Sequence, residues 1–439
     1  MEKILLSFIA FNFSVCCAQT NEGYVKTNVY KDSMPGFKAL VPDTATPSAM
    51  DAANKILYLK IALEKENLHD FAAAIATYSK VIAMDTACLQ AYVNRGIAKD
   101  SLEDFTGSVA DYTKAIAIDS MCIRAYVNRG LAKDNLEDYQ GAIADYDKAT
   151  AINKKYLPAY IYRGLAKDNR GDYHGAITDY SAVIEMDKKY FEAYIYRAIS
   201  KDSLHDFRGA VYDYSKAIEL NDKCLLAYIN RAAAKDSLRD YKSAIPDYTK
   251  IIEIKPGEVR WYIKRAAAKD SLQDYRGAIA DYTKAISLDP DNVTTYTSCA
   301  NAKINIKDYL GALDDCSVAV MVDPACEAAY KIMGAVKYKQ QDFLGAIGEY
   351  NKAIEINPGY ADAFRSRGYA KANLRDYRGA VADYDRAIAI NAADADAYFN
   401  RGIIKMVLQQ KEAGCADFKK ARELGNEEAY KLIKKYCEK

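Results

Sequence analysis

Apolar and small residues recur along most of the chain at spacings of three and four, with polar positions between them. In the stretch that begins at Leu89, counted as position 1, they fall at positions 4, 8, 10, 17, 20, 21, 24, 27 and 28. Such spacings place side chains on one face of an α-helix. The stretch therefore predicts two amphipathic helices, near positions 2–14 and 18–31, joined by a short turn.

The same pattern returns every 34 residues without insertion or deletion, and divides residues 55–428 into eleven repeats. Aspartate at position 16, as in Asp104, is a favourable N-cap for the second helix. Proline at position 32, as in Pro256, marks the end of that helix. A helix pair is too small to bury its own apolar face, so this period predicts a row of stacked repeats. The repeats begin at residues 55, 89, 123, 157, 191, 225, 259, 293, 327, 361 and 395.

Position by position, the repeat has a specific signature. Aromatic residues dominate positions 4, 17 and 24, as in Tyr92, Phe105 and Tyr112, and small residues dominate positions 8, 20 and 27. This signature resembles the tetratricopeptide repeat family. The resemblance implies an all-α fold, a right-handed α-solenoid of eleven helix-turn-helix repeats. Residues 429–439 then supply a C-terminal capping helix whose lysines give the last repeat a polar cover.

One departure from the family is regular. Arginine replaces the usual leucine at position 7 in eight repeats, and each of these repeats has aspartate at position 23. Because a partly buried guanidinium needs a carboxylate, we predict an Arg–Asp pair between the two helices of a repeat, with a structural role. Lysine occupies position 11 in every repeat and is predicted to lay its alkyl stem along the same seam. The predicted pairs are Arg95–Asp111, Arg129–Asp145, Arg163–Asp179, Arg197–Asp213, Arg231–Asp247, Arg265–Asp281, Arg367–Asp383 and Arg401–Asp417.

The N-terminal residues follow a different pattern. After Lys3, a mostly apolar run over residues 4–13 is too short to span a bilayer. With small residues near Ala18, it fits a secretory signal peptide at residues 1–18, which predicts an exported protein, periplasmic or secreted. A lipoprotein signal is the alternative, although the cysteines here have poor contexts for acylation. Residues 19–54 carry Thr, Asp, Pro and Gly without periodicity and predict a flexible lead-in.

Composition argues against several functions. Lys+Arg number 61 and Asp+Glu 60, so no basic excess attracts nucleic acid. The three histidines have no Cys or His partner at ligand spacing, which argues against a metal. The chain has no nucleophile elbow, phosphate-binding glycine loop or singular carboxylate pair, so we expect no catalysis and no cofactor. No second apolar segment predicts a membrane span.

Four cysteines are candidates for disulfides. Cys299 and Cys316 occupy positions 7 and 24 of one repeat, on facing helices, and either form a bridge or stay as two buried thiols. Cys415 lies in the last repeat and Cys437 in the capping helix. The end of the chain is similar to tails of exported bacterial repeat proteins, which implies a Cys415–Cys437 bond that would fix the terminal helix.

The first helix of each repeat has a second, variable face at positions 2, 5, 9, 12 and 13. In solenoids of the family this face lines the concave groove. Positions 5 and 9 are aliphatic in the first seven repeats, and position 12 is aspartate in six successive repeats. From about residue 293 onward, these three positions hold a mixture of residue types. The predicted groove residues are Val93, Ile97, Asp100, Val127, Leu131, Asp134, Ile161, Leu165, Asp168, Ile195, Ile199, Asp202, Ile229, Asp236, Ile263 and Asp270.

The aspartate row allows two interpretations. Each aspartate lies near a helix C-terminus, where a carboxylate opposes the helix dipole, so some compensation is needed. It either pairs with a Lys or Arg of an adjoining repeat or forms an acidic ladder for a peptide with basic and apolar side chains. The clamp that some family members use for C-terminal carboxylates is missing from every repeat.

The resemblance and the variable face together predict a non-catalytic scaffold that binds a protein or peptide segment in the concave groove. An envelope- or glycan-associated structural protein is the alternative, and a purely self-assembling solenoid is a third. The partner's identity and the oligomeric state stay open at this point.

Overall fold

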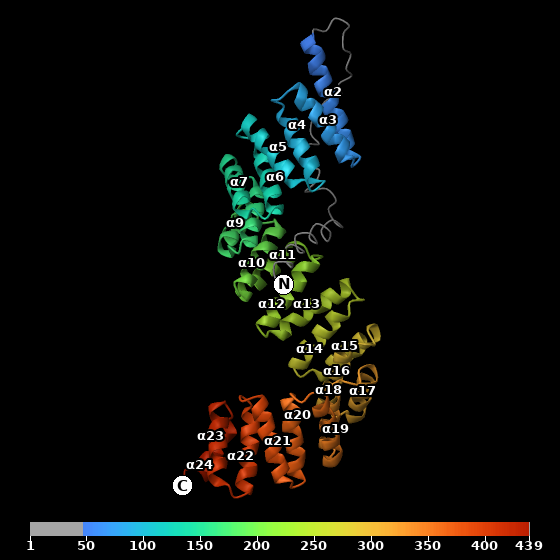
Figure 1. Cartoon of the computed structure of the whole chain (residues 1–439), viewed down its shortest axis with the longest axis vertical. Coiled ribbons are helices and arrows are strands. Elements are labelled where there is room, and N and C mark those ends of the chain that lie inside the picture. Colours follow the sequence, from blue (N-terminus) through green and yellow to red (C-terminus); the bar gives the residue numbers. More distant parts are fainter. Residues whose placement is uncertain (1–46, 439) are drawn as a thin grey trace. The chain divides into compact units, whose positions relative to one another are not determined.

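The computed structural model describes residues 47–438, and every regular element in that range is an α-helix (Figure 1). The predicted all-α architecture of paired helices is confirmed. The first helices of successive repeats are α2 (Pro47–Asn67), α4 (Leu89–Asp100), α6 (Ile123–Asn135), α8 (Leu157–Asn169), α10 (Phe191–Ser203), α12 (Leu225–Ser237), α14 (Val259–Ser271), α16 (Val293–Asn305), α18 (Glu327–Lys339), α20 (Ala361–Asn373) and α22 (Ala395–Val407). The second helices are α3 (Phe71–Met84), α5 (Phe105–Ile118), α7 (Tyr139–Ile152), α9 (Tyr173–Met186), α11 (Phe207–Leu220), α13 (Tyr241–Ile254), α15 (Tyr275–Leu288), α17 (Tyr309–Val322), α19 (Phe343–Ile356), α21 (Tyr377–Ile390) and α23 (Lys411–Glu423), and α24 (Glu427–Tyr436) follows them.

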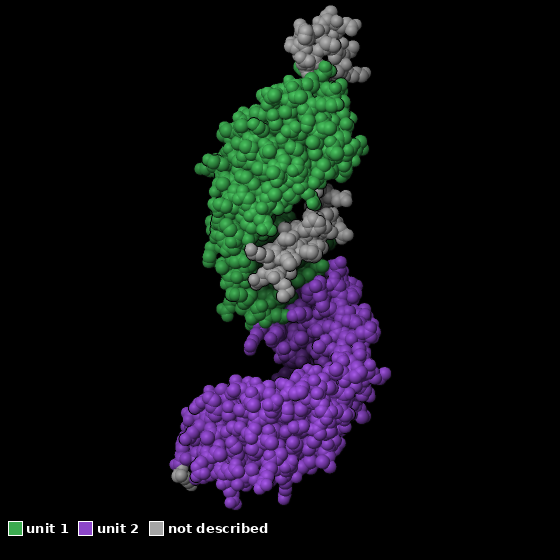
Figure 2. Space-filling view, viewed as in Figure 1, with its two compact units in different colours: residues 1–238 green, residues 239–439 purple. Residues whose placement is uncertain are grey.

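The described helices fall into two compact units, coloured separately in Figure 2: unit 1 up to residue 238 and unit 2 from residue 239. In unit 1, α4 packs on α5 and α5 on α6, while α4 also touches α6. In unit 2, α18, α19 and α20 repeat this arrangement. Each unit is therefore a row of helix pairs held by neighbours in sequence. We call the surface formed by successive first helices the first-helix face.

Both ends differ in detail from the sequence-based boundaries. Helix α2 begins at Pro47, so the segment predicted as a flexible lead-in is helical from residue 47 onward. Its sequence explains this, because Ala52 and Ala53 favour a helix and proline is tolerated in a first turn. The predicted signal peptide and the rest of the lead-in lie outside the described residues. No helix among residues 47–438 is long and apolar enough to cross a membrane.

The turn inside each repeat is built by the predicted N-cap. The Asp104 side chain accepts a hydrogen bond from Gly107 N, 2.9 Å away, and so satisfies a free amide at the start of α5. The residue before the cap is left-handed, with φ of 61° at Glu103 and 86° at Gly171. The cap and the left-handed residue recur in most described repeats and end one helix where the next begins.

The two helices of a repeat approach closely because position 8 is small. A Cβ added to Gly96 would lie 2.6 Å from the Tyr112 ring, so only a small residue fits beneath this ring without displacing it. The tyrosine at position 24, such as Tyr112 or Tyr180, is completely buried. This contact sets the register of the repeat: position 8 faces position 24, and position 7 faces position 23.

The predicted Arg–Asp pair forms, and the lysine at position 11 joins it. In the α4–α5 pair, Arg95 Nε and Nη2 donate to the two Asp111 oxygens at 2.9 and 2.5 Å, and Lys99 Nζ lies 2.8 Å from Asp111 Oδ2. The lysine is thus a second cation, beyond the packing role predicted for its stem. Equivalent triads are Arg129–Asp145–Lys133, Arg163–Asp179–Lys167, Arg197–Asp213–Lys201, Arg265–Asp281–Lys269, Arg367–Asp383–Lys371 and Arg401–Asp417–Lys405.

The arginine also connects neighbouring repeats, which the sequence did not predict. Arg95 Nη1 donates to Ser79 Oγ of the preceding repeat at 2.9 Å, and Arg163 Nη1 contacts Asp147 Oδ1 of its preceding repeat at 2.6 Å. One guanidinium therefore joins three helices. Its planar set of five N–H donors makes this possible, whereas a lysine could not bond in two directions so regularly.

The register explains why one candidate disulfide is not formed. Cys299, at position 7, faces Asp315 at position 23, whereas Cys316 at position 24 packs on Ala300 at position 8. Both cysteines are free and buried. Burial raises the pKa of each thiol to about 12. The two buried thiols are therefore the correct alternative for this pair.

The other candidate disulfide is formed. Cys415 on α23 and Cys437 at the end of α24 are bonded, with their Cα atoms 5.7 Å apart. Helix α24 also buries Ala429 and Ile433 against Phe418 of α23. It begins at Glu427, two residues before the predicted cap, where Asn426 serves as the N-cap.

Candidate functional site

The predicted groove residues of unit 1 are mostly packing residues. Val93, Val127, Ile161 and Ile195, all at position 5, are buried within the hydrophobic clusters of their repeats. At position 9, Ile97, Leu131, Leu165 and Ile199 are half-buried against the same clusters. Ile229 and Ile263 are also half-buried. The prediction of an open aliphatic floor at position 5 is therefore wrong for these four repeats of unit 1, because these side chains complete the core.

The aspartate row has a partner that neither interpretation named. The hydroxyl of the tyrosine at position 24 donates to the aspartate at position 12 of the same repeat. The Oη–Oδ2 distance is 2.6 Å for Tyr112–Asp100 and 2.8 Å for Tyr146–Asp134. The same bonds are Tyr180–Asp168 and Tyr214–Asp202, each 2.8 Å long. In these four repeats the partner is thus a buried hydroxyl, and not a Lys or Arg of an adjoining repeat.

These carboxyl groups are poorly placed for an acidic ladder. The Oδ1 atoms of Asp134 and Asp202 are buried and have no hydrogen-bond partner among the described residues. Asp168 is buried, and Ser200 Oγ of the next repeat lies 2.8 Å from its Oδ1. Burial raises the pKa of Asp134 and Asp168 from 3.8 to about 7 and that of Asp202 to about 6, while the tyrosine bond opposes the rise. Asp236 and Asp270, the remaining members of the row, are half-buried.

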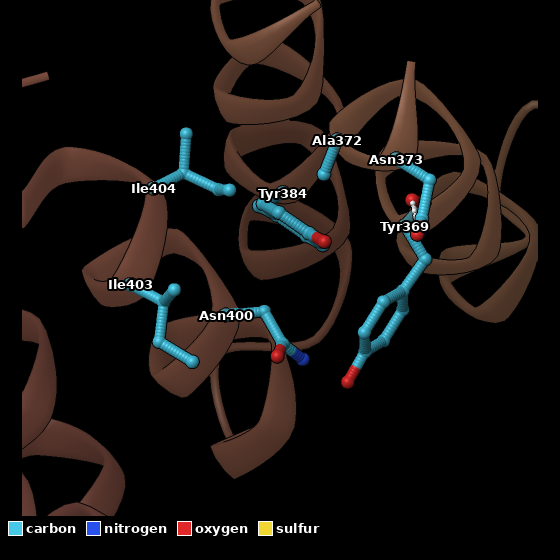
Figure 3. Close-up of a pocket in the computed structure, with 7 residues that line it drawn as sticks. All are labelled: Tyr369, Ala372, Asn373, Tyr384, Asn400, Ile403 and Ile404. Atoms are coloured by element: carbon cyan, nitrogen blue, oxygen red, sulfur yellow. Dashed lines mark hydrogen bonds between the residues drawn. The ribbon is translucent and has the colours of Figure 1, made fainter. Parts of the chain in front are cut away.

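The row ends in unit 2, where position 12 holds Ile304, Tyr338, Ala372 and Met406. At Ala372 the loss of the carboxylate leaves a cavity of about 240 Å³. Figure 3 shows Ala372 and Tyr384 on one side of this cavity, and Asn400, Ile403 and Ile404 of α22 on another. The full lining is Tyr369, Ala372, Asn373, Tyr384, Asn400, Ile403 and Ile404.

Polar groups of the cavity are available to a ligand. Tyr384 is 1% exposed, and its hydroxyl has no hydrogen-bond partner among residues 47–438. Asn400 is also buried; its Nδ2 donates to Asp396 O at 2.6 Å, and its side chain also hydrogen-bonds with the Tyr369 hydroxyl. The oxygen of the Tyr384 hydroxyl is not fully buried, so this donor is accessible from the cavity. The cavity therefore presents the Tyr384 hydroxyl and the amide groups of Asn373 and Asn400 between apolar walls.

Apolar side chains are exposed beside the cavity on the first-helix face. Tyr369 of α20 is 39% exposed, and Ile403 and Val407, one turn apart on α22, are 36% and 52% exposed. The Tyr369 ring meets the Tyr384 ring edge-on, with centroids 6.1 Å apart, which holds it at the rim. We call Tyr369, Ile403, Val407 and the cavity lining the α20–α22 pocket.

The sequence contains a signal for this pocket. Position 12 changes from aspartate to alanine in this repeat, while position 24 stays tyrosine, a residue that the repeat pattern by itself assigns to packing. The pair of positions 12 and 24 carries the information, since Ala372 removes the acceptor while Tyr384 keeps the donor. Among residues 47–438, no group of three or more His, Cys, Asp or Glu side chains is arranged to hold a metal ion.

Comparisons with known proteins agree with the repeat architecture. The family model for the tetratricopeptide repeat matches residues 89–120, 123–156, 225–258 and 259–292. Comparison with curated proteins gave no match.

Solved structures that match this chain include the following three. Yeast Tom70 is 15% identical at a TM-score of 0.43, over 87% of this chain and 94% of that one. A tetratricopeptide repeat protein from Parabacteroides merdae is 17% identical at a TM-score of 0.42, over 56% and 98%. MamA from Desulfovibrio magneticus is 20% identical at a TM-score of 0.34, over 40% and 97%.

The four matched segments begin at multiples of 34 residues from one another, in register with the two-helix repeats of the structure. Residues 89–120, 123–156, 225–258 and 259–292 are tetratricopeptide repeats.

Proposed function

We propose that the protein is a non-catalytic interaction scaffold that binds a segment of a partner protein on the first-helix face of unit 2. The observation that carries this proposal is the α20–α22 pocket, which combines a cavity of about 240 Å³ with an unpaired tyrosine hydroxyl and an apolar rim. Concave sites with apolar walls and a few convergent polar groups are typical binding sites. Rigid helices on both sides keep the site preformed, which lowers the entropic cost of binding.

The location differs from the one predicted from sequence. In unit 1, the four described Tyr–Asp bonds pair the tyrosine hydroxyls, and position 5 belongs to the core in the same repeats. In unit 2, the repeat that begins at residue 361 lacks the carboxylate and leaves its tyrosine unpaired. The repeat with an unpaired tyrosine hydroxyl that opens into a cavity is therefore the one to which we assign the partner.

Site-specific photo-crosslinking in the native organism tests the proposal. A photoreactive residue at Tyr369 or Ile403 should give a discrete adduct with one protein partner. The matched control is Leu344 on α19, which is 73% exposed and lies on a second helix, and it should give little of this adduct. An adduct formed equally well from Leu344, or none from α20 and α22, would overturn the proposal. Adducts with polysaccharide alone would favour the envelope-associated alternative.

We also propose that the protein works outside the cytoplasm. The pattern of residues 1–18 supports this, and so does the Cys415–Cys437 bond, because disulfides persist in oxidising compartments. The intact mass of protein purified from the native organism checks the proposal. It should correspond to a chain that begins at Gln19 with the disulfide formed, and a full-length reduced chain in the cytoplasmic fraction would contradict it.

A further inference from the structure

The repeats of this chain provide an internal comparison. In four repeats of unit 1 the hydroxyl at position 24 is bonded to the carboxylate at position 12, at 2.6–2.8 Å. In the repeat that begins at residue 361, Tyr384 keeps the hydroxyl, but Ala372 supplies no acceptor and a cavity lies in its place. We infer that a ligand completes this bond, and that the ligand is a leucine-type residue of a partner segment, bound through its side chain and its backbone amide groups. This inference rests on the proposed function and specifies its anchor.

The hydrogen-bond acceptor must come from the ligand. The Tyr384 hydroxyl has no hydrogen-bond partner among residues 47–438, although Asn373 and Asn400 also line the cavity: the Asn373 amide donates to Tyr369 O and the Asn400 amide to Asp396 O. Pairing a buried polar group removes the penalty of leaving it unsatisfied. A carbonyl oxygen that replaces the missing carboxylate oxygen would therefore bind with a net gain.

A neutral acceptor suits the cavity better than a carboxylate. No charged side chain lines the cavity. Arg365, the nearby cation, is already engaged by Asp362 at 2.7 Å and by Asp394 and Asp396 at 3.3 Å. In the reference repeats, burial also raises the pKa of the carboxyl at position 12, to about 7 for Asp134, which shows the cost of a charge there. A backbone carbonyl avoids this cost.

Size and wall chemistry select the side chain. The cavity of about 240 Å³ exceeds the roughly 150 Å³ that accommodates a benzene molecule in an engineered apolar site. Ile403 and Ile404 supply branched aliphatic walls, and Ala372 adds a methyl group. A branched aliphatic side chain fits this space and buries apolar surface, which stabilises the complex.

A peptide matches the polar groups better than a hydrocarbon. The Tyr384 hydroxyl can donate to a peptide carbonyl, and Asn400 Oδ1 can accept from a peptide N–H. Backbone groups always come as one donor and one acceptor per residue. The exposed Tyr369, Ile403 and Val407 then cover the flanking residues of the segment.

The test uses the full chain and the small probe N-acetyl-leucinamide, which carries one leucine side chain and two amide groups. NMR of the protein with labelled tyrosine and isoleucine should show millimolar binding, with saturable shifts at Tyr384, Ile403 and Ile404. The matched probe with an aspartate side chain in place of leucine should bind at least about tenfold more weakly. Absence of saturable shifts with the leucine probe, or equal binding of both probes, would overturn the inference.

Two variants sharpen the result. Ala372→Asp copies the Asp–Tyr pair that unit 1 already contains, and should abolish probe binding while circular dichroism stays unchanged. Tyr384→Phe keeps the ring but removes the donor, and should weaken binding about fivefold, the effect of one hydrogen bond. If Tyr384→Phe leaves the affinity unchanged, the bond is absent and the inference fails, whatever the stability of Ala372→Asp. Probe binding does not require the native partner, so its failure is distinguishable from a failed crosslinking experiment.

Discussion

Replacing Asp213 by alanine is expected to lower the free energy of unfolding of the α10–α11 repeat by about 3–5 kcal/mol. Asp213 is completely buried and accepts from Arg197 Nη2 at 2.6 Å and from Lys201 Nζ at 2.7 Å. Its removal leaves two partly buried cations without a counter-charge. Native-state hydrogen exchange of the α10 and α11 amides measures this effect, because it reports the opening of each region separately.

The chain provides a matched control at Asp147. This residue also contacts an arginine, Arg163 at 2.6 Å, but its side chain is 58% exposed. Asp147→Ala should therefore cost less than about 1 kcal/mol, as expected for an exposed ion pair. If Asp147→Ala and Asp213→Ala lower the free energy of unfolding equally, burial does not determine how much the Arg–Asp–Lys triads stabilise the protein. Because stability in repeat proteins is a sum of local and neighbouring terms, the Asp213 effect should spread to α9 and α12 but decline beyond them.

Acidification is expected to stabilise the repeats of unit 1 that carry the aspartate row. Burial raises the pKa of Asp168 in the folded state from 3.8 to about 7. A raised carboxyl pKa means that the folded state binds the proton more tightly than the unfolded state. The contribution of Asp168 to stability is thus fully present below pH 3.8 and is lost as the pH rises through 7. For this buried group the difference is about 4 kcal/mol, because each pKa unit corresponds to about 1.4 kcal/mol.

The variant Asp168→Asn isolates the contribution of the Asp168 charge to the free energy of unfolding. Asparagine keeps an oxygen that can accept from Tyr180, whose hydroxyl lies 2.8 Å from Asp168 Oδ2, and it carries no charge. The variant should be more stable than the native protein at pH 8, and the difference should shrink or reverse at pH 5. Hydrogen exchange of the α8 and α9 amides at both pH values provides the measurement. A variant that is less stable at pH 8 would indicate that the ionised carboxylate stabilises the fold.

The sequence was sufficient for the features that depend on local spacing. The 34-residue period gave the helix pairs, Asp104 and its equivalents gave the N-caps, and the joint presence of arginine and aspartate gave the buried pairs. Each of these depends on residue types a few positions apart, for which helix geometry dictates the relative directions. The Cys415–Cys437 bond was also predicted, and the structure forms it.

The sequence was insufficient where the register between two helices matters to within one position. Pairing positions 7 and 24 suggested a Cys299–Cys316 bridge, but position 7 faces position 23, so Cys299 meets Asp315. The same register brings Tyr112 to Asp100 across the helix pair, a contact that amphipathic patterns do not encode. The α20–α22 pocket was missed for this reason, since it is visible only when Ala372 and Tyr384 are considered together.

The central claim is that the first-helix face of unit 2 binds a partner segment at the α20–α22 pocket. Hydroxyl-radical footprinting of the full chain, alone and with a peptide selected against it by display, tests this claim most directly. Oxidation of Tyr369, Ile403 and Val407 should fall together on binding, while oxidation of Leu344 on α19, exposed at 73%, should not change. Unchanged oxidation at Tyr369 and Ile403 with protection at Leu344 would contradict the claim.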